Sequence, residues 1–172
     1  MAEVAFLSYA REDLPFVRAL TGALRPDREI AWDQDRDKTI RPAAPWWKEI
    51  EAAIRRSGKF ILVISPESLA SDICGRELRY ALSLGKQVLP VALRPPAPEW
   101  KPPDDRDDLA RVFELQWIFF DDDTAFQASV SELIWALDND LATSTYYIWL
   151  VDRAAERNRP GPTADRCYAA AP

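Results

Sequence analysis

The stretch KFILVIS, residues 59–65, decides the fold of this chain. It is a continuous apolar run between Lys59 and Ser65, and such runs, rich in β-branched residues, are typical of buried strands. Ser65 and Pro66 then form a pair typical of a helix N-cap with proline at the first helical position. The stretch therefore predicts a buried strand that leads directly into a helix.

Strand-like and helix-like segments alternate on both sides of this strand. Further strands are expected at 4–8, 29–33, 87–93 and 115–120, and Pro90 marks an edge or irregular position in the fourth strand. Residues 94–108 are proline-rich and acidic, which predicts a surface loop without regular structure. Amphipathic helices are expected on the faces Phe16, Val17, Leu20 and Leu24; Trp46, Ile50, Ala53 and Ile54; Cys74, Leu78, Ala81 and Leu82; and Phe126, Val130, Leu133, Ile134 and Leu137.

This alternation predicts an α/β fold. We expect a flavodoxin-like three-layer sandwich around a five-stranded parallel sheet of order 2-1-3-4-5. The chain of 172 residues is expected to form one domain over residues 1–140, a C-terminal helix over 141–158 and a flexible tail over 159–172. In this architecture, ligands bind beyond the carboxyl ends of the first and third strands.

The composition excludes several classes of function. The chain has no histidine, so Ser-His-Asp and Cys-His catalysis and histidine metal sites are excluded. Its five glycines form neither a dinucleotide-binding fingerprint nor a P-loop, and Cys74 and Cys167 do not make a disulfide framework. A net charge of −6 argues against direct nucleic-acid binding. Without a signal peptide or a membrane-length apolar run, a cytoplasmic protein that does not enter a membrane is expected.

Glu77 is out of place in the stretch SDICGREL, residues 71–78. On a helix it lies four residues after Ile73 and four before Ala81, so a carboxylate lies against an apolar stripe, where a charge is costly. The predicted sheet order brings Tyr9, Arg11, residues 33–47 and residues 65–77 to one crevice. Glu77 is therefore expected near the place where this architecture holds its ligand.

Four segments in order resemble a bacterial TIR (Toll/interleukin-1 receptor) domain: FLSYAREDLPFVRAL, WDQDRDKTIRPAAPWWKEIEAAIRRS, FILVISPESLASDICGREL and ALSLGKQVLPVAL. The resemblance covers about residues 1–140 and implies the flavodoxin-like fold. Many bacterial TIR domains cleave NAD+ at the nicotinamide–ribose bond, often in anti-phage defence or as effectors, and others only assemble. The segment YYIWLVDRAAER, residues 146–157, resembles the one that follows TIR domains in larger bacterial regulators.

The resemblance also assigns roles to residues. The family's catalytic glutamate, in a pattern like S-x-W-C-x-x-E, matches Glu77, with Ile73 in the tryptophan position. The pattern S-Y-x-x-x-D matches Ser8, Tyr9 and Asp13. The loop before Trp46 lacks the glycine that the family usually carries there. The substrate-binding residues expected are Tyr9, Ala10, Arg11, Asp33, Trp46, Trp47, Ile73 and Cys74.

One carboxylate suits this chemistry. The nicotinamide of NAD+ is cationic and leaves as a neutral molecule, so no general acid is required, and a carboxylate can stabilise the oxocarbenium character of the ribose. Trp46, Trp47 or Tyr9 can stack on an aromatic ring, and Arg11 can bind the pyrophosphate. NAD+ would be the substrate, with no cofactor and no metal, and the product linear or cyclic ADP-ribose.

Each assignment has a purely structural alternative. Glu77 can be a helix carboxylate paired with an arginine, and one of the two tryptophans is expected in the core. Asp13 is expected to cap the first helix, and Cys74 to be buried packing. A calcium loop starting at Asp33 is rejected, because the glycine and glutamate that such a loop requires are missing.

Two functions remain open. The first is an NAD+ nucleosidase activated by self-assembly, and the second is a non-catalytic module that acts by homotypic assembly. A phosphoacceptor receiver domain shares the fold but is disfavoured, because the third strand ends in Ser65 and the first strand lacks the required acidic pair.

Overall fold

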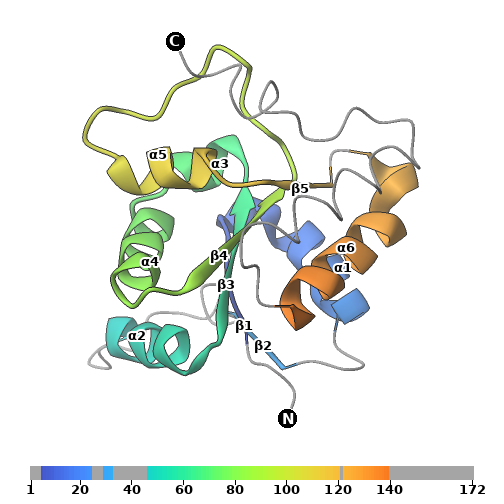
Figure 1. The fold of residues 1–172 in the computed structure, drawn as a ribbon, viewed down its shortest axis with the longest axis horizontal. Helices are drawn as coiled ribbons and strands as arrows, with labels where there is room; N and C mark the ends of the chain where they lie inside the picture. Colours follow the sequence, from blue (N-terminus) through green and yellow to red (C-terminus); the bar gives the residue numbers. More distant parts are fainter. Residues whose placement is uncertain (1–4, 25–28, 33–45, 121, 140–172) are drawn as a thin grey trace.

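The computed structural model describes residues 5–24, 29–32, 46–120 and 122–139, and these form one α/β unit (Figure 1). Five parallel strands lie in the order β2-β1-β3-β4-β5, which confirms the predicted sheet. The strands are β1 (Ala5–Ser8), β2 (Ile30–Trp32), β3 (Lys59–Ile64), β4 (Gln87–Ala92) and β5 (Ile118–Phe119).

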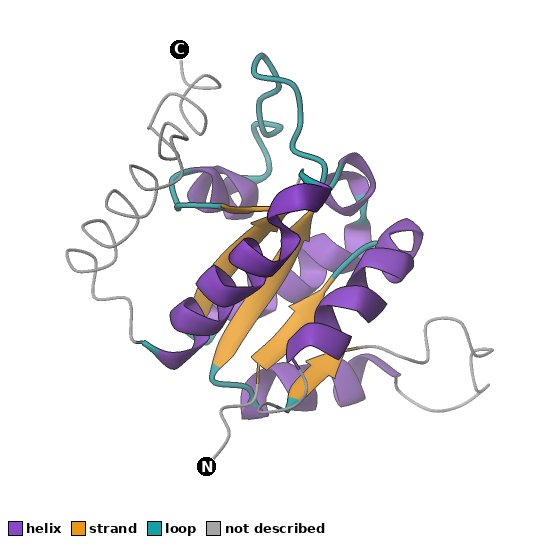
Figure 2. Cartoon of the chain, turned by 90° about the vertical axis from the view of Figure 1, so that its right-hand side faces the viewer, coloured by secondary structure: helices purple, strands orange, loops and turns teal. Residues whose placement is uncertain are grey.

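Helices cover both faces of the sheet, as Figure 2 shows. One face carries α2 (Trp46–Arg56), α4 (Asp72–Ser83) and α5 (Asp107–Phe113), and the other carries α1 (Leu14–Leu24) and α6 (Phe126–Asp138). Short elements follow three of the strands in the part of the chain that the structure describes: η1 (Arg11–Asp13), α3 (Pro66–Ala70) and η3 (Asp123–Ala125). The result is the expected three-layer sandwich.

The alternation of side chains along each strand builds two cores. Leu7 of β1 and Ile61 of β3 pack on the α1 and α6 side. Phe6 and Phe60 point to the α2 and α4 side, where their rings stack. Since successive strand residues face opposite sides, Ser8 points to the same side as Phe6.

The third predicted helix is two helices. Ser71 is both the C-cap of α3 and the N-cap of α4, and its side chain accepts a hydrogen bond from the backbone N–H of Cys74. Ser65 caps α3 as predicted, in a capping box with Ser68. The break at Ser71 starts α4 beside the carboxyl end of the sheet, and this sets the direction from which Glu77 approaches β1.

The region after β4 differs most from expectation. Residues 107–113 form α5, although residues 107–108 were assigned to a loop, and Asp107 and Asp108 supply the acidic first turn that favours a helix start. The strand expected over 115–120 is limited to Ile118–Phe119. Before it, Leu115 is exposed and Trp117 packs edge to face on Phe113 and donates its indole N–H to the Val112 carbonyl.

Pro90 lies in β4, which is not the edge strand of the sheet, but at a position where one side of the strand is unpaired. It pairs in register with Leu62 of β3. On the other side, β5 pairs with β4 only at Val91 and Ala92. A proline is tolerated at this position because no paired β5 residue requires its missing N–H.

The C-terminal helix and tail expected at 141–158 and 159–172 lie outside the described residues, and so does Asp33. Within the described residues, no helix is both long and apolar enough to cross a bilayer.

Candidate functional site

Glu77 is completely buried, with 0% of its surface exposed, and lies on the core-facing side of α4. Its neighbours on that side include Cys74 and Ala81, both buried. The Ser8 hydroxyl donates a hydrogen bond of 2.5 Å to Glu77 Oε2. A buried carboxylate needs such donors, and Ser8 faces Glu77 because it ends β1 on the side that packs against α4. The structure thus brings together two residues that are 69 positions apart.

The turn after β1 holds three of the predicted binding residues. Tyr9 and Ala10 are buried, and Arg11 is exposed at the start of η1. The turn is closed by a hydrogen bond of 2.9 Å from the backbone N–H of Asp13 to the Ala10 carbonyl. Tyr9 makes an edge-to-face contact with Trp32 at the end of β2. Arg11 therefore lies at the surface of the predicted crevice, and Tyr9 lies in the core beside it.

Asp13 directly precedes α1, at the position where the cap was predicted, and its side chain also binds residues of other elements. Its buried carboxylate accepts a hydrogen bond of 2.5 Å from the Ser65 hydroxyl and one of 2.6 Å from Arg94 Nη2. Arg94 also pairs with Glu67 of α3, at 2.7 Å from Glu67 Oε2. These four residues, which we call the strand-end cluster, join the ends of β1, β3 and β4. The family pattern pointed to Asp13, but no local signal pointed to Arg94, which opens a proline-rich loop.

The charges of the strand-end cluster influence one another. The hydrogen bond from Arg94 is the main cause that holds the pKa of Glu67 below its ordinary value of 4.5. The same bond, followed by the one to Asp13, raises the pKa of Arg94. The Arg94 guanidinium is thus a fixed positive charge at the carboxyl end of the sheet.

Of the two neighbouring tryptophans of α2, Trp46 was expected on the apolar stripe, but Trp47 is the one that packs against the core. Trp46 is 44% exposed. The Arg76 guanidinium lies 3.8 Å from the centroid of a Trp47 ring, and the Tyr80 ring meets Trp47 edge to face. Trp47 thus packs on the two α4 residues at positions −1 and +3 from Glu77. Trp46 is the tryptophan left accessible to a ligand or partner.

Ile73, Cys74 and Gly75 lead into Glu77 along α4. Ile73 is exposed, whereas Cys74 is a buried free cysteine, as the packing interpretation predicted. Gly75 is a close-approach position, because an added Cβ would lie 2.8 Å from Arg106 Nη2. Arg106 in turn pairs with Asp108 of α5 at 2.9 Å. The loop after β4 is therefore held against α4 two residues before Glu77.

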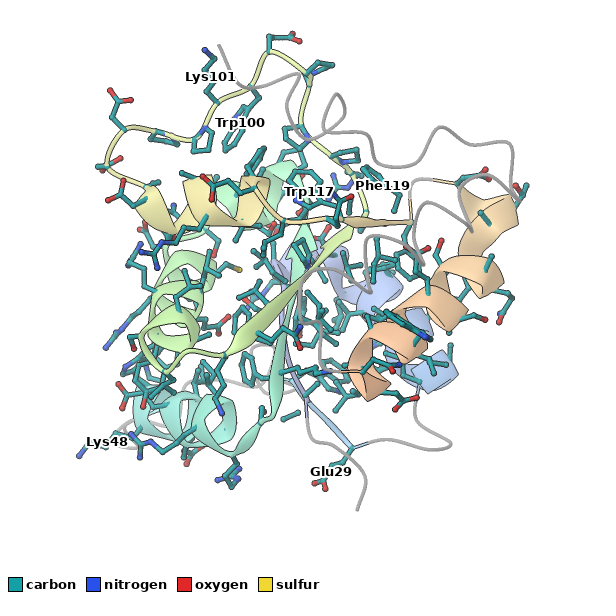
Figure 3. The ribbon with its side chains drawn as sticks, viewed as in Figure 1. Glu29, Lys48, Trp100, Lys101, Trp117 and Phe119 are labelled. Carbon is teal, nitrogen blue, oxygen red and sulfur yellow. The ribbon has the colours of Figure 1, made fainter. Side chains whose placement is uncertain are left out.

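Aromatic packing supports the other end of this loop. Trp100 stacks on Phe113 of α5, and Phe113 meets Trp117 edge to face. Figure 3 shows Trp100 on the loop at the top of the view, Trp117 below it near β5, and Lys48 of α2 at the lower left. Among the described residues, no group of three or more Cys, Asp or Glu side chains is placed to hold a metal ion.

Comparisons with known proteins agree with this architecture. A family model described as a TIR domain matches residues 5–134. A TIR domain of the Toll-related receptor TRR-2 from Hydra magnipapillata superposes with a TM-score of 0.58 at 20% identity, covering 78% of this chain and 98% of that one. The TIR domains of the activated Roq1 resistosome, which directly recognises the pathogen effector XopQ, superpose with a TM-score of 0.61 at 20% identity, covering 79% of this chain and 99% of that one.

No curated protein sequence matches the chain. The two structural similarities, at 20% identity, concern the fold alone. The family model spans most of the chain, from the start of β1 into α6. Together with the sheet order 2-1-3-4-5, this match shows that the chain belongs to the TIR domain family.

Proposed function

We propose that this TIR domain is an NAD+ nucleosidase in which Glu77 carries the chemistry. The observation that carries the proposal is the buried Glu77 carboxylate, which α4 places beside Ser8 at the carboxyl end of β1. This is the edge of the sheet where ligands bind in this architecture. The finer assignment, a bacterial cytoplasmic enzyme of defence or signalling, belongs to the same proposal.

The reaction breaks the bond between the nicotinamide nitrogen and C1′ of the ribose. Its electron pair returns to the ring, so the cationic nicotinamide leaves as a neutral molecule and the ribose gains oxocarbenium character. The Glu77 carboxylate stabilises this charge electrostatically. Water then adds at C1′ and releases a proton, giving ADP-ribose, or an atom of the same nucleotide adds and gives a cyclic product.

The burial of Glu77 determines how the activity would be controlled. Because the carboxylate is 0% exposed in the single chain, the side chains around it must rearrange before NAD+ can reach it. A surface that forms when copies assemble can supply this rearrangement. The proposal therefore includes activation by homotypic assembly, with Arg11 and Trp46 as exposed residues for the pyrophosphate and an aromatic ring.

The test follows nicotinamide release from NAD+ by concentrated protein. Glu77→Gln keeps the side-chain shape and an acceptor for Ser8 but removes the negative charge, so release should fall at least about 100-fold while the fold is retained. Glu132→Gln is the matched control, because Glu132 is a buried glutamate of α6. Equal release from wild type and Glu77→Gln would contradict the assignment of Glu77.

The second candidate is a module that acts only by homotypic assembly. The observation that favours it is again the burial of Glu77, because a fully buried and hydrogen-bonded glutamate also suits a purely structural role. Under this alternative, wild type forms oligomers but releases no nicotinamide, even when the oligomers are stabilised by crowding. Light scattering and the nicotinamide assay on the same sample separate the two functions.

A further inference from the structure

We infer that Arg94 is a positioning residue, which holds the η1 turn against the ends of β3 and β4 so that the turn can bind substrate. The expected effect of Arg94 on substrate binding rests on the proposed function. The structural part of the inference, the control of η1 by Arg94, is independent of that function.

The backbone of Arg94 is fixed at the sheet. The N–H groups of Leu93 and Arg94 both donate to the carbonyl of Ile64, each at 3.1 Å. Ile64 is the last residue of β3, and β3 lies between β1 and β4. The side chain of Arg94 therefore extends from the end of β4, across the end of β3, to the turn after β1.

At that turn, Arg94 is the positively charged partner of the buried Asp13 carboxylate. The Asp13 side chain is 0% exposed, whereas the Arg94 side chain is 48% exposed. Asp13 receives one bond from Arg94 and one from the Ser65 hydroxyl. Without Arg94, a buried carboxylate keeps one neutral donor, and a buried charge that has lost its partner is strongly unfavourable. The Asp13 carboxylate would then be expected to move toward solvent, where water can hydrate its charge.

Moving Asp13 would open the η1 turn. The backbone N–H of Asp13 closes the turn by bonding to the Ala10 carbonyl. Arg11, the residue proposed for the pyrophosphate, lies inside this turn. Glu77 and Ser8, by contrast, are held by α4 and β1. Loss of Arg94 should therefore weaken substrate binding much more than the chemical step.

Glu67 provides the matched control. It also binds Arg94, but from the exposed side of the strand-end cluster, and it has no bond to η1. Glu67→Gln removes one partner of Arg94 and leaves the Arg94–Asp13 pair. If Arg94 acts only as a general stabiliser of the strand-end cluster, Arg94→Gln and Glu67→Gln should behave alike.

The first measurement is amide hydrogen exchange on the full chain, and it needs no enzymatic activity. In Arg94→Gln the Asp13 amide should exchange about tenfold faster or more, while the amides of β3 keep most of their protection. Arg94→Lys, which keeps one charged donor, should restore part of the Asp13 protection, and Glu67→Gln should leave it unchanged. Unchanged Asp13 exchange in Arg94→Gln, or equal losses at Asp13 and throughout β3, would overturn the inference.

The second measurement is the kinetics of nicotinamide release. Arg94→Gln should raise KM about tenfold with a much smaller change in kcat, and Arg94→Lys should recover part of the loss. A fall in kcat with KM unchanged would overturn the binding role. If wild type releases no nicotinamide, the proposed function fails, and the exchange experiment alone decides whether Arg94 positions η1.

Discussion

The Ser8 hydroxyl is the donor that connects the sheet to the Glu77 carboxylate. It points at Oε2 from the end of β1, and both side chains are buried. A hydrogen bond to a charged group contributes about 1.5–3 kcal/mol, and its orientation fixes the direction of the carboxylate. Ser8 therefore belongs to the candidate site as the residue that orients the Glu77 carboxylate.

Replacing Ser8 tests this connection. Ser8→Ala should lower kcat for nicotinamide release about tenfold, because the Glu77 carboxylate loses a donor that holds its direction. Ser8→Thr keeps the hydroxyl and suits a strand, so it should retain most of the activity. Steady-state kinetics of both variants, with thermal unfolding as a check of folding, decide the matter. Equal rates for wild type and Ser8→Ala would show that this bond does not orient the reacting carboxylate.

The ion pair between Glu67 and Arg94 predicts a pH dependence of stability. Arg94 lowers the pKa of Glu67 below its ordinary value of 4.5. Because the pKa is lower in the folded state than in the unfolded state, the pair's contribution is fully present above about pH 4.5. It is lost as the pH falls through the lowered pKa.

We therefore expect wild type to be more stable than Glu67→Gln near neutral pH, and expect this difference to shrink as the pH falls below 4.5 and through the lowered pKa of Glu67. Urea unfolding of both proteins at several pH values measures it. Raising the salt concentration should also reduce the difference, because the pair is accessible to solvent. A difference in stability that stays constant across this pH range would show that Glu67 stabilises the protein by packing and not by its charge.

The contact between α4 and the loop before α5 depends on Gly75. The Arg106 guanidinium lies 2.8 Å from the position of an added Cβ and is held there by Asp108, whose side chain is buried. The pKa of Arg106 is raised, chiefly by its hydrogen bond to Asp108. Glycine at this helical position therefore permits a close approach of two elements at the cost of helix propensity.

Whether Gly75→Ala stabilises or destabilises the protein should depend on Arg106. In wild type it should destabilise the protein by about 1 kcal/mol, because Arg106 must move away from Asp108. In an Arg106→Ala background, the same change should stabilise by about 0.5 kcal/mol, since alanine is the better helix former and only the flexible tip of Arg79, 3.3 Å from the added Cβ, has to give way. A double-mutant cycle by urea unfolding measures this coupling. The same effect in both backgrounds would show that Arg106 does not constrain Gly75.

The rate of nicotinamide release per molecule is expected to depend on the protein concentration. If burial of Glu77 keeps the single chain inactive and assembly exposes it, the rate per molecule should rise with protein concentration. Nicotinamide release measured over a 100-fold range of protein concentration, with light scattering on the same samples, tests this. Glu77→Gln should show the same scattering without the activity. A constant rate per molecule, with no change in scattering, would show that assembly does not control the site.

The sequence by itself determined the order of the strands, the parallel sheet and the position of Glu77 at its carboxyl edge. The individual strands and helices follow from patterns within a few residues, such as the apolar run at 59–65, the cap at Ser65 and the glutamate on an apolar stripe of α4. The sheet order follows from the fold class that their alternation indicates. The TIR family followed from four such segments in order. Local periodicity reports such features because it reflects burial on one face of one element.

Only the tertiary structure decided which side chains meet. Ser8 bonds to Glu77 across 69 positions, and Asp13 bonds to Arg94 across 81 positions. Trp46, expected on the apolar stripe of α2, is exposed, and α5 begins at Asp107, inside the last two residues of the loop expected over 94–108. The physical reason is that the packing of neighbouring strands and helices sets these contacts. A pattern that repeats every two or four residues carries no information about a partner on another element.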